Sequence, residues 1–233
     1  MLSLSRLQWT LLCMSMLTVM ASTPIAPALP YIAQAFAQEP RAEVLSRLVL
    51  TMPALFVVLG APLIGALADR YGRKPIIILA LLIYAVAGTS GFYARTLEQI
   101  LMGRALLGLA IAAIMSLTTT LIADYFSGEE RARLMGLQGA FTTAAGVLFL
   151  CLGGLLADIH WRFTFLTYAV GLVLVPLALQ ALYEPLHKST ATVSGISPWP
   201  ITLLLVIYGA ALTGHAGFFI LTVHLPFHLR DVF

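Results

Sequence analysis

Long apolar stretches separated by short polar segments make up most of this chain. Seven of them are long enough for a helix that crosses a bilayer, which takes ~20 residues. They occupy residues 9–32, 44–67, 75–94, 98–123, 134–157, 163–182 and 200–223. A membrane-spanning β-barrel would instead show segments of ~10 residues in which apolar and polar positions alternate. The pattern therefore predicts an all-α membrane protein.

The first stretch has features of a secretory signal peptide, because Arg6 precedes an apolar run and Val19-Met20-Ala21 resembles a cleavage site. Its apolar character continues to Ile32, however, which is longer than the apolar region of a signal peptide. We therefore expect a retained helix. Its prolines are Pro24, Pro27 and Pro30. They predict interruptions, which either line a transport path or are plain kinks.

The composition agrees with a membrane protein, because 60% of the residues are hydrophobic and only 10% are charged. The mean hydropathy is +0.96. Soluble domains carry about 25% charged residues, and the net charge of +3 is too small for a surface that binds polyanions. A soluble enzyme and a nucleic-acid partner are therefore excluded. Cys13 and Cys151 lie in apolar stretches and are expected to be core residues.

The basic residues indicate an orientation through the positive-inside rule. With a cytoplasmic amino terminus, the cytoplasmic side would hold Arg6, Arg70, Arg73, Lys74, Arg131, Arg133 and Lys188. The other side would hold Arg41, Arg47, Arg95, Arg162 and Arg230. The tight cluster at 70–74 contributes most to this difference. We therefore predict a cytoplasmic amino terminus in the cell (inner) membrane.

A short pattern recurs at the ends of two predicted helices. Residues Gly65–Asp69 read GALAD and residues Gly154–Asp158 read GLLAD, and an arginine, Arg73 or Arg162, follows each by four positions. The copies lie 89 residues apart, a distance of three predicted helices, so the second copy would emerge on the opposite side of the membrane. Two three-helix units of opposite topology are typical of transporters with inverted repeats. A chance match between residues common in membrane helices is the alternative.

The segment Gly65–Pro75, GALADRYGRKP, joins the second and third predicted helices. Gly65 permits a close helix contact, Asp69 can accept from a helix amino terminus or an arginine, and Gly72 permits a tight reversal. The basic residues are Arg70, Arg73 and Lys74. They fix the loop at the cytoplasmic face. Because a purely basic topology signal would not need the Gly and Asp positions, we interpret the segment as a conformational latch.

This segment resembles the signature loop of the major facilitator superfamily, whose pattern is G-x-L-a-D-r-x-G-r-k. The matching residues are Gly65, Leu67, Asp69, Arg70, Gly72, Arg73 and Lys74. The resemblance implies twelve helices in two six-helix halves, each built of inverted 3+3 repeats. It also implies that the loop is a gate, whose aspartate holds the two halves together on the cytoplasmic side in one transport state.

Further stretches resemble the same family. The matching residues are Arg104 and Gly108 in the fourth predicted helix, Asp124, Arg131 and Arg133 around the second cytoplasmic loop, and His160–Phe163 before the sixth helix. The resemblance to drug exporters implies that Arg104 takes part in proton transfer or contacts the substrate. At Phe149 and Leu150, however, proton-coupled exporters usually carry a Gly-Pro pair. Proton coupling therefore stays open.

Ionisable residues inside membrane spans are costly and indicate function. Arg104 lies clearly within a span, near its non-cytoplasmic end, where it could also extend to the interface. We favour a role in the cavity or in coupling for Arg104 and Gly108. His215, in the seventh helix, is expected to pack or to line the cavity. His224 and His228 have the spacing of a metal face, but Pro226 lies between them and no third ligand is near, so we expect no metal and no cofactor.

Two other membrane classes do not fit. A retinal protein needs a lysine in its last helix, whereas Lys74 and Lys188 lie in predicted loops. An intramembrane hydrolase needs reactive groups at membrane depth. The candidate carboxylates, Asp69, Asp124 and Asp158, all lie at helix ends. We therefore expect a protein that is not an enzyme.

The predicted organisation is a six-helix amino-terminal half at 1–183, a cytoplasmic linker at 184–199 and a seventh membrane helix at 200–233. The expected function is secondary active transport of a small molecule, in the efflux branch, by alternating access. The alternative is a truncated or split transporter fragment without independent transport, which acts only as an interaction partner or remnant. Expected partners are a small-molecule substrate, the lipid bilayer and a second half-transporter chain.

Overall fold

The computed structural model describes residues 4–39 and 41–185, together with positions 202, 206, 209, 210, 213, 214 and 217. The chain divides into two compact units, Met1–Glu184 and Pro185–Phe233, here called unit 1 and unit 2. The described part of unit 1 consists of helices, turns and short connections, with no strand. The predicted all-α class is therefore confirmed.

The helices of unit 1 follow the predicted apolar stretches. They are α1 (Arg6–Val19), η1 (Ala26–Ala28), α2 (Leu29–Ala35), α3 (Ala42–Tyr71), α4 (Arg73–Tyr93), α5 (Leu97–Tyr125), α6 (Gly128–Ile159), η2 (Trp161–Ala169) and α7 (Val170–Ala181). Among the described residues, five helices are long and apolar enough to cross a membrane, with η2 and α7 counted together. The ends of α3 and α6 extend beyond the predicted spans because charged residues continue both helices past the apolar core.

The first predicted span, 9–32, is not one continuous helix. Ser5 and Gln8 form a capping box at the start of α1, which ends at Val19. Pro24 lacks a backbone N–H and cannot continue the helical hydrogen bonds. The backbone N–H of Ile25 donates to Ser22 O, at 3.2 Å, and not to Ala21 O as it would in a continuous α-helix. The interruption predicted from the prolines is therefore confirmed.

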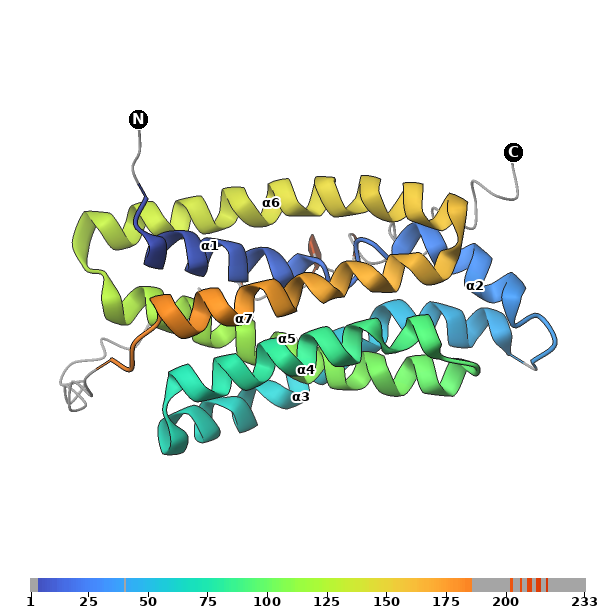
Figure 1. Ribbon diagram of the computed structural model, residues 1–233, viewed down its shortest axis with the longest axis horizontal. Helices are drawn as coiled ribbons and strands as arrows, with labels where there is room; N and C mark the ends of the chain where they lie inside the picture. The colour runs from blue at the N-terminus through green and yellow to red at the C-terminus, as the bar shows by residue number, and fades with distance from the viewer. Residues whose placement is uncertain are drawn as a thin grey trace. The chain divides into compact units, whose positions relative to one another are not determined.

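Helix α5 forms the core of unit 1. It packs along α3 and α4 and also contacts α1, while α1 packs against α6. Figure 1 shows these helices running side by side along a common direction. Most of α5 is buried, whereas α3 and α6 expose much of their apolar surface. A side chain in the middle of α5 is therefore enclosed by other helices.

Helix ends gather at two opposite ends of unit 1. At one end, which we call the Gly72 end, Gln8 of α1 donates to Glu130 of α6 at 2.8 Å, and the last residue of α5 contacts the segment after α7. At the other, the His160 end, Tyr31 of α2 donates to Asp158 of α6 at 3.1 Å. The chain therefore alternates between the two ends, as expected for successive membrane crossings.

In unit 2, all seven described positions between 202 and 217 are helical. The hydroxyl of Thr213 donates to Gly209 O at 3.0 Å, a bond to the preceding turn of a helix. These positions fall within the predicted span 200–223. His215, His224 and His228 lie outside the described residues, as do Lys188 and nearly all of the predicted linker.

Candidate functional site

The turn between α3 and α4 depends on Gly72. This residue has a φ of 89° and separates Tyr71, the last residue of α3, from Arg73, the first residue of α4. Residues other than glycine rarely adopt a positive φ of this kind, because their Cβ atom clashes with the backbone. A Cβ atom at Gly72 would also lie 2.9 Å from the carboxylate of Glu184. The tight reversal predicted at Gly72 is present, and it brings the signature segment against the segment that follows α7.

Glu184 caps the amino terminus of α4. Its carboxylate oxygens accept hydrogen bonds from the backbone N–H groups of Arg73 and Lys74, at 2.7 and 2.9 Å. The first N–H groups of a helix have no partner within the helix, and the helix dipole favours an anion there. The Lys74 ammonium donates to Leu179 O at 3.0 Å. Both residues thus join the start of α4 to the end of α7.

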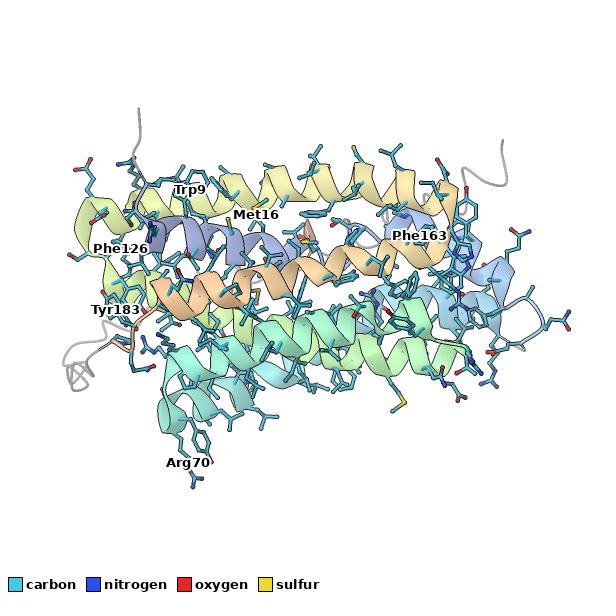
Figure 2. The ribbon with its side chains drawn as sticks, in the orientation of Figure 1. Trp9, Met16, Arg70, Phe126, Phe163 and Tyr183 are labelled. Carbon is cyan, nitrogen blue, oxygen red and sulfur yellow. The ribbon has the colours of Figure 1, made fainter. Side chains whose placement is uncertain are left out.

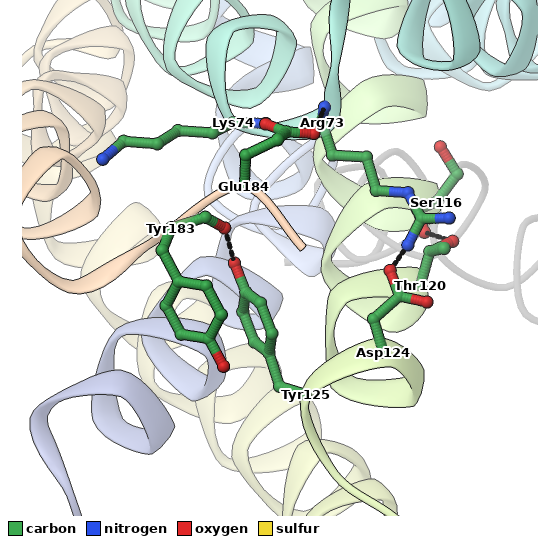
Figure 3. A network of polar contacts seen from close by, with 8 residues as sticks. All are labelled: Arg73, Lys74, Ser116, Thr120, Asp124, Tyr125, Tyr183 and Glu184. Atoms are coloured by element: carbon green, nitrogen blue, oxygen red, sulfur yellow. Dashed lines mark hydrogen bonds and ion pairs between the residues drawn. The ribbon is translucent and has the colours of Figure 1, made fainter. Parts of the chain in front are cut away.

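Arg73 makes a second connection, to the end of α5. Its guanidinium forms an ion pair with the carboxylate of Asp124, and both side chains are about three-quarters buried. Next to this pair, the hydroxyl of Tyr125 donates to Tyr183 O, and the two rings lie 4.4 Å apart. Figure 3 shows Arg73 and Lys74 extending in opposite directions from Glu184. This Gly72-end network joins α4, α5 and the segment after α7.

The other candidate residues predicted for the two cytoplasmic loops lie outside this network. Asp69 is exposed and makes no ion pair or hydrogen bond with the described residues. Arg70 lies over the ring of Tyr71, at 5.3 Å, and Figure 2 shows it pointing away from the helices. Arg131 and Arg133 are exposed near the start of α6. The carboxylate at the amino terminus of α4 is that of Glu184, and Asp69 meets neither a helix amino terminus nor an arginine within the described part of the chain.

Gly65 does not make the close helix contact expected for it. A Cβ atom there would have no neighbour within 4 Å among the described residues. Gly108, by contrast, lies in a tight contact, because a Cβ atom would be 2.5 Å from Pro53 O and 2.8 Å from the Cβ of Phe56. Gly108 therefore allows α5 to approach α3, which is a packing role. The close contact predicted at Gly65 is not observed among the described residues and stays a prediction.

Arg104 lies in the first third of α5 and is buried inside unit 1, with 2% of its surface exposed. Its Nη1 donates to Ala21 O at 3.1 Å and to the hydroxyl of Tyr168 at 2.9 Å. The guanidinium also lies 5.0 Å from the ring of Phe165 and 4.7 Å from that of Tyr168. Its Nη2 is buried without a hydrogen-bond partner among the described residues. The side chain therefore points into unit 1.

The second copy of the repeated pattern lies at the His160 end. There Asp158 accepts from Tyr31, and Arg162 Nη1 donates to Phe92 O at 2.9 Å. Arg162 also stacks over Trp161, at 4.8 Å. The two copies therefore lie at opposite ends of unit 1, as predicted from the three helices between them.

Sequence reasoning missed Glu184 and Tyr168. Glu184 is the first acidic residue after the sixth predicted span, and this position was its only sequence signal. Tyr168 lies in an apolar run and carries no signal of its own. Within the described ranges, no three His, Cys, Asp or Glu side chains gather in a way that could hold a metal ion.

The family model described as Major Facilitator Superfamily matches residues 11–233 of the chain. Among similar proteins, Multidrug resistance protein 3 of Bacillus subtilis is 32% identical over 110 residues, or 47% of this chain and 22% of that protein. The class H tetracycline resistance protein of Pasteurella multocida is 27% identical over 174 residues, or 75% of this chain and 43% of that protein. The chain thus matches less than half of the length of each relative.

Solved structures show the same fold. A D-xylose-proton symporter superposes with a TM-score of 0.69 at 14% identity, over 91% of this chain and 53% of that one. A bacterial homologue of the human lysosomal transporter Spinster, in an inward-facing and occupied conformation, gives a TM-score of 0.65 at 21% identity. That match covers 79% of this chain and 45% of the homologue.

Proposed function

The chain belongs to the Major Facilitator Superfamily, and from this premise we propose that it serves secondary active transport of a small molecule, in the direction of efflux, by alternating access. Unit 1 would be one of the two helical halves between which the substrate binds. The names of the relatives, multidrug and tetracycline resistance proteins, support a drug-like organic substrate. Coupling to a proton or another ion stays open.

The observation that carries this proposal is the buried Arg104. A charge inside a membrane span is costly and marks a substrate or ion pathway. Here the guanidinium contacts the broken first segment through Ala21 O and keeps one nitrogen, Nη2, unpaired among the described residues. This nitrogen can donate to an acceptor on a substrate or to an ionisable group elsewhere in the transporter.

The gate function of the signature loop is part of the same proposal. The Gly72-end network holds the start of α4 against α5 and the segment after α7, so this end of unit 1 would move as one body. Asp69 and Arg70 lie outside that network, on the exposed side of the turn. They are therefore available to contact a second half, in this chain or in another, when the gate closes. Arg131 and Arg133 would face the same side.

For the orientation we propose that the Gly72 end is cytoplasmic and that the protein resides in the cell (inner) membrane. The basic residues at this end support the assignment through the positive-inside rule. The same proposal places the predicted linker 184–199 in the cytoplasm. The span at 200–223 would then be the first helix of the second half.

Accumulation assays test the transport proposal. Bacteria that lack their own exporters would express the chain, and the uptake of tetracycline and of a quinolone would be followed over time. We expect lower accumulation than in cells without the chain, because efflux removes the compound. Arg104→Gln should abolish the difference, whereas Arg95→Gln, at an exposed position of the His160 end, should keep it.

Equal accumulation in cells with and without the chain would contradict transport by this protein. Equal activity of Arg104→Gln and the parent would contradict the role of Arg104 while leaving transport intact. Immunoblots of membrane fractions control for the amount of each variant.

A further inference from the structure

The break in the first segment leaves a carbonyl group without a helical donor. In a continuous helix, the N–H of Ile25 would donate to Ala21 O. Here it donates to Ser22 O instead. An unpaired carbonyl inside the membrane is costly, so another donor must take its place.

Two side chains from other helices supply that donor. Nη1 of Arg104 donates to Ala21 O at 3.1 Å, and the hydroxyl of Tyr168 donates to the same oxygen at 3.1 Å. Tyr168 also accepts a hydrogen bond from Arg104 Nη1, at 2.9 Å. The three groups form a closed triangle, in which the tyrosine hydroxyl accepts from the guanidinium and donates to the carbonyl.

The position of Tyr168 is fixed by its own surroundings. It is fully buried in η2, and a Cβ atom at Gly88 of α4 would lie 2.4 Å from its Cβ. Because a 3₁₀-helix has three residues per turn, Phe165 and Tyr168 lie on one face of η2. Both rings contact the guanidinium of Arg104. The tyrosine is therefore a rigid support against which the longer, flexible arginine is held.

The triangle divides the two terminal nitrogens of Arg104 between two roles. Nη1 is used by Ala21 O and Tyr168, whereas Nη2 is buried without a partner in the described part of the chain. A guanidinium that lost Tyr168 could rotate and bring either nitrogen to the carbonyl. The hydroxyl thus determines which nitrogen stays available.

We propose that Tyr168 is a positioning residue, whose hydroxyl holds Arg104 Nη1 on Ala21 O. These hydrogen bonds keep the interrupted part of the first segment packed against Arg104, which we call the closure of the break. They also leave Nη2 free for its partner in transport. The last part of this statement rests on the proposed function. The closure of the break does not, because it follows from contacts within unit 1.

Thiol labelling at the break tests the closure. The full-length protein would carry Ser22→Cys with Cys13→Ser and Cys151→Ser, and the rate of its reaction with a small maleimide would be measured in detergent. Loss of a hydrogen bond in which one partner is charged corresponds to about tenfold in an opening equilibrium. We therefore expect Tyr168→Phe to raise the labelling rate about tenfold.

Tyr84→Phe is the matched control. Tyr84 is also fully buried, contacts the ring of Tyr168 at 5.7 Å and donates to Leu17 O, which lies within α1 and before the break. Loss of the Tyr84 hydroxyl should leave the rate at which the introduced thiol is labelled close to that of the parent. An equal rise in both variants would show a general loosening of the core and overturn the proposal, as would no rise in Tyr168→Phe.

Arg104→Lys supplies the second variant. Lysine keeps the charge but cannot hold the planar contacts with two groups and two rings. In this background, Tyr168→Phe should add little to the labelling rate, because the triangle is already broken. If the factors by which the two single substitutions raise the labelling rate instead multiply in the double variant, the proposal is overturned. The labelling experiment does not depend on transport. If the two substitutions are coupled in this way but the protein does not lower drug accumulation, the proposed function is contradicted, whereas the closure of the break still stands.

Discussion

Glu184 binds the backbone N–H of Arg73 at 2.7 Å across 111 residues of chain. With its second bond, to the N–H of Lys74, it provides the anion that the amino terminus of α4 requires. The last residue of unit 1 is thus fastened to the turn that carries the signature segment. Any movement of the end of α7 would be transmitted to the start of α4.

Removal of this cap should destabilise unit 1. Glu184→Ala leaves two N–H groups of α4 to solvent, and because the site is exposed we expect a loss of about 1 kcal/mol in the free energy of unfolding. Equilibrium unfolding of the purified protein in detergent measures it. Glu39→Ala removes a carboxylate that makes no side-chain bond to the described residues and should have a smaller effect. Equal losses in the two variants would speak against the cap.

Alanine at two glycines of the signature segment should have effects of opposite sign. Gly72→Ala forces a side chain into a φ of 89° and against Glu184, and should cost about 1–2 kcal/mol. Gly65→Ala, inside α3 with open space around its Cβ, should stabilise by about 0.5–1 kcal/mol. Both are measured by the same unfolding experiment. Destabilisation by Gly65→Ala would indicate a close contact at this position in the membrane.

Patterns local in sequence predicted most of the fold. Apolar runs gave the helices of unit 1 to within a few residues at most ends, the prolines gave the break, and Gly72 gave the turn. These features depend on backbone geometry and on the transfer of apolar side chains from water to lipid. Both are determined by the residues of each segment alone, without contacts to other segments.

Contacts distant in sequence were not predictable in this way. From the sequence, Asp69 could accept from a helix amino terminus or from an arginine. In the structure Asp69 is exposed, and the amino terminus of α4 is capped by Glu184, which lies far along the sequence. Tyr168 could not be distinguished from a core aromatic residue, because its hydroxyl contacts Ala21 O, a carbonyl that is free only because the N–H of Ile25 donates to Ser22 O. Such partners are set by how the helices pack, for which one sequence carries no direct signal.

The ion pair between Arg73 and Asp124 should couple α4 to α5 energetically. A double-mutant cycle with Arg73→Gln and Asp124→Asn is expected to give a coupling of about 0.5–1 kcal/mol, because both side chains are only partly exposed. The same cycle for Glu43 and Arg47, an i,i+4 pair on α3 with a more exposed carboxylate, should give about 0.3–0.5 kcal/mol. A coupling near zero in the first pair would show that the network does not hold the two helices.

Impermeant thiol reagents should distinguish the two ends of unit 1 in intact cells. Ser127→Cys lies at the exposed turn between α5 and α6, at the Gly72 end, and should be protected if that end is cytoplasmic. Gln38→Cys follows α2 at the His160 end and should be labelled. Permeabilised cells, in which both should react, provide the control. The reverse pattern would place the amino terminus outside.

The two copies of the repeated pattern make comparable connections at opposite ends. Arg73 of the first copy binds Asp124 in the last turn of α5, and Asp158 of the second copy binds Tyr31 in α2. In each case the segment after the second helix of one predicted repeat is tied to the far part of the first membrane segment of the other. The His160-end bond should therefore hold α2 against α6, as the Gly72-end network holds α4 against α5.

Tyr31→Phe tests this correspondence. Loss of an exposed hydrogen bond of about 0.5 kcal/mol should raise amide hydrogen exchange in Leu29–Ala35 about twofold, without a change around Arg73. Glu184→Ala should instead raise amide hydrogen exchange around Arg73 and leave exchange in Leu29–Ala35 unchanged. Tyr93→Phe, on a ring that is 74% exposed, controls for loss of a hydroxyl at the same end. If Tyr31→Phe leaves exchange in α2 unchanged, or alters both ends equally, the second copy does not act as a local tie and its likeness to the first is one of sequence only.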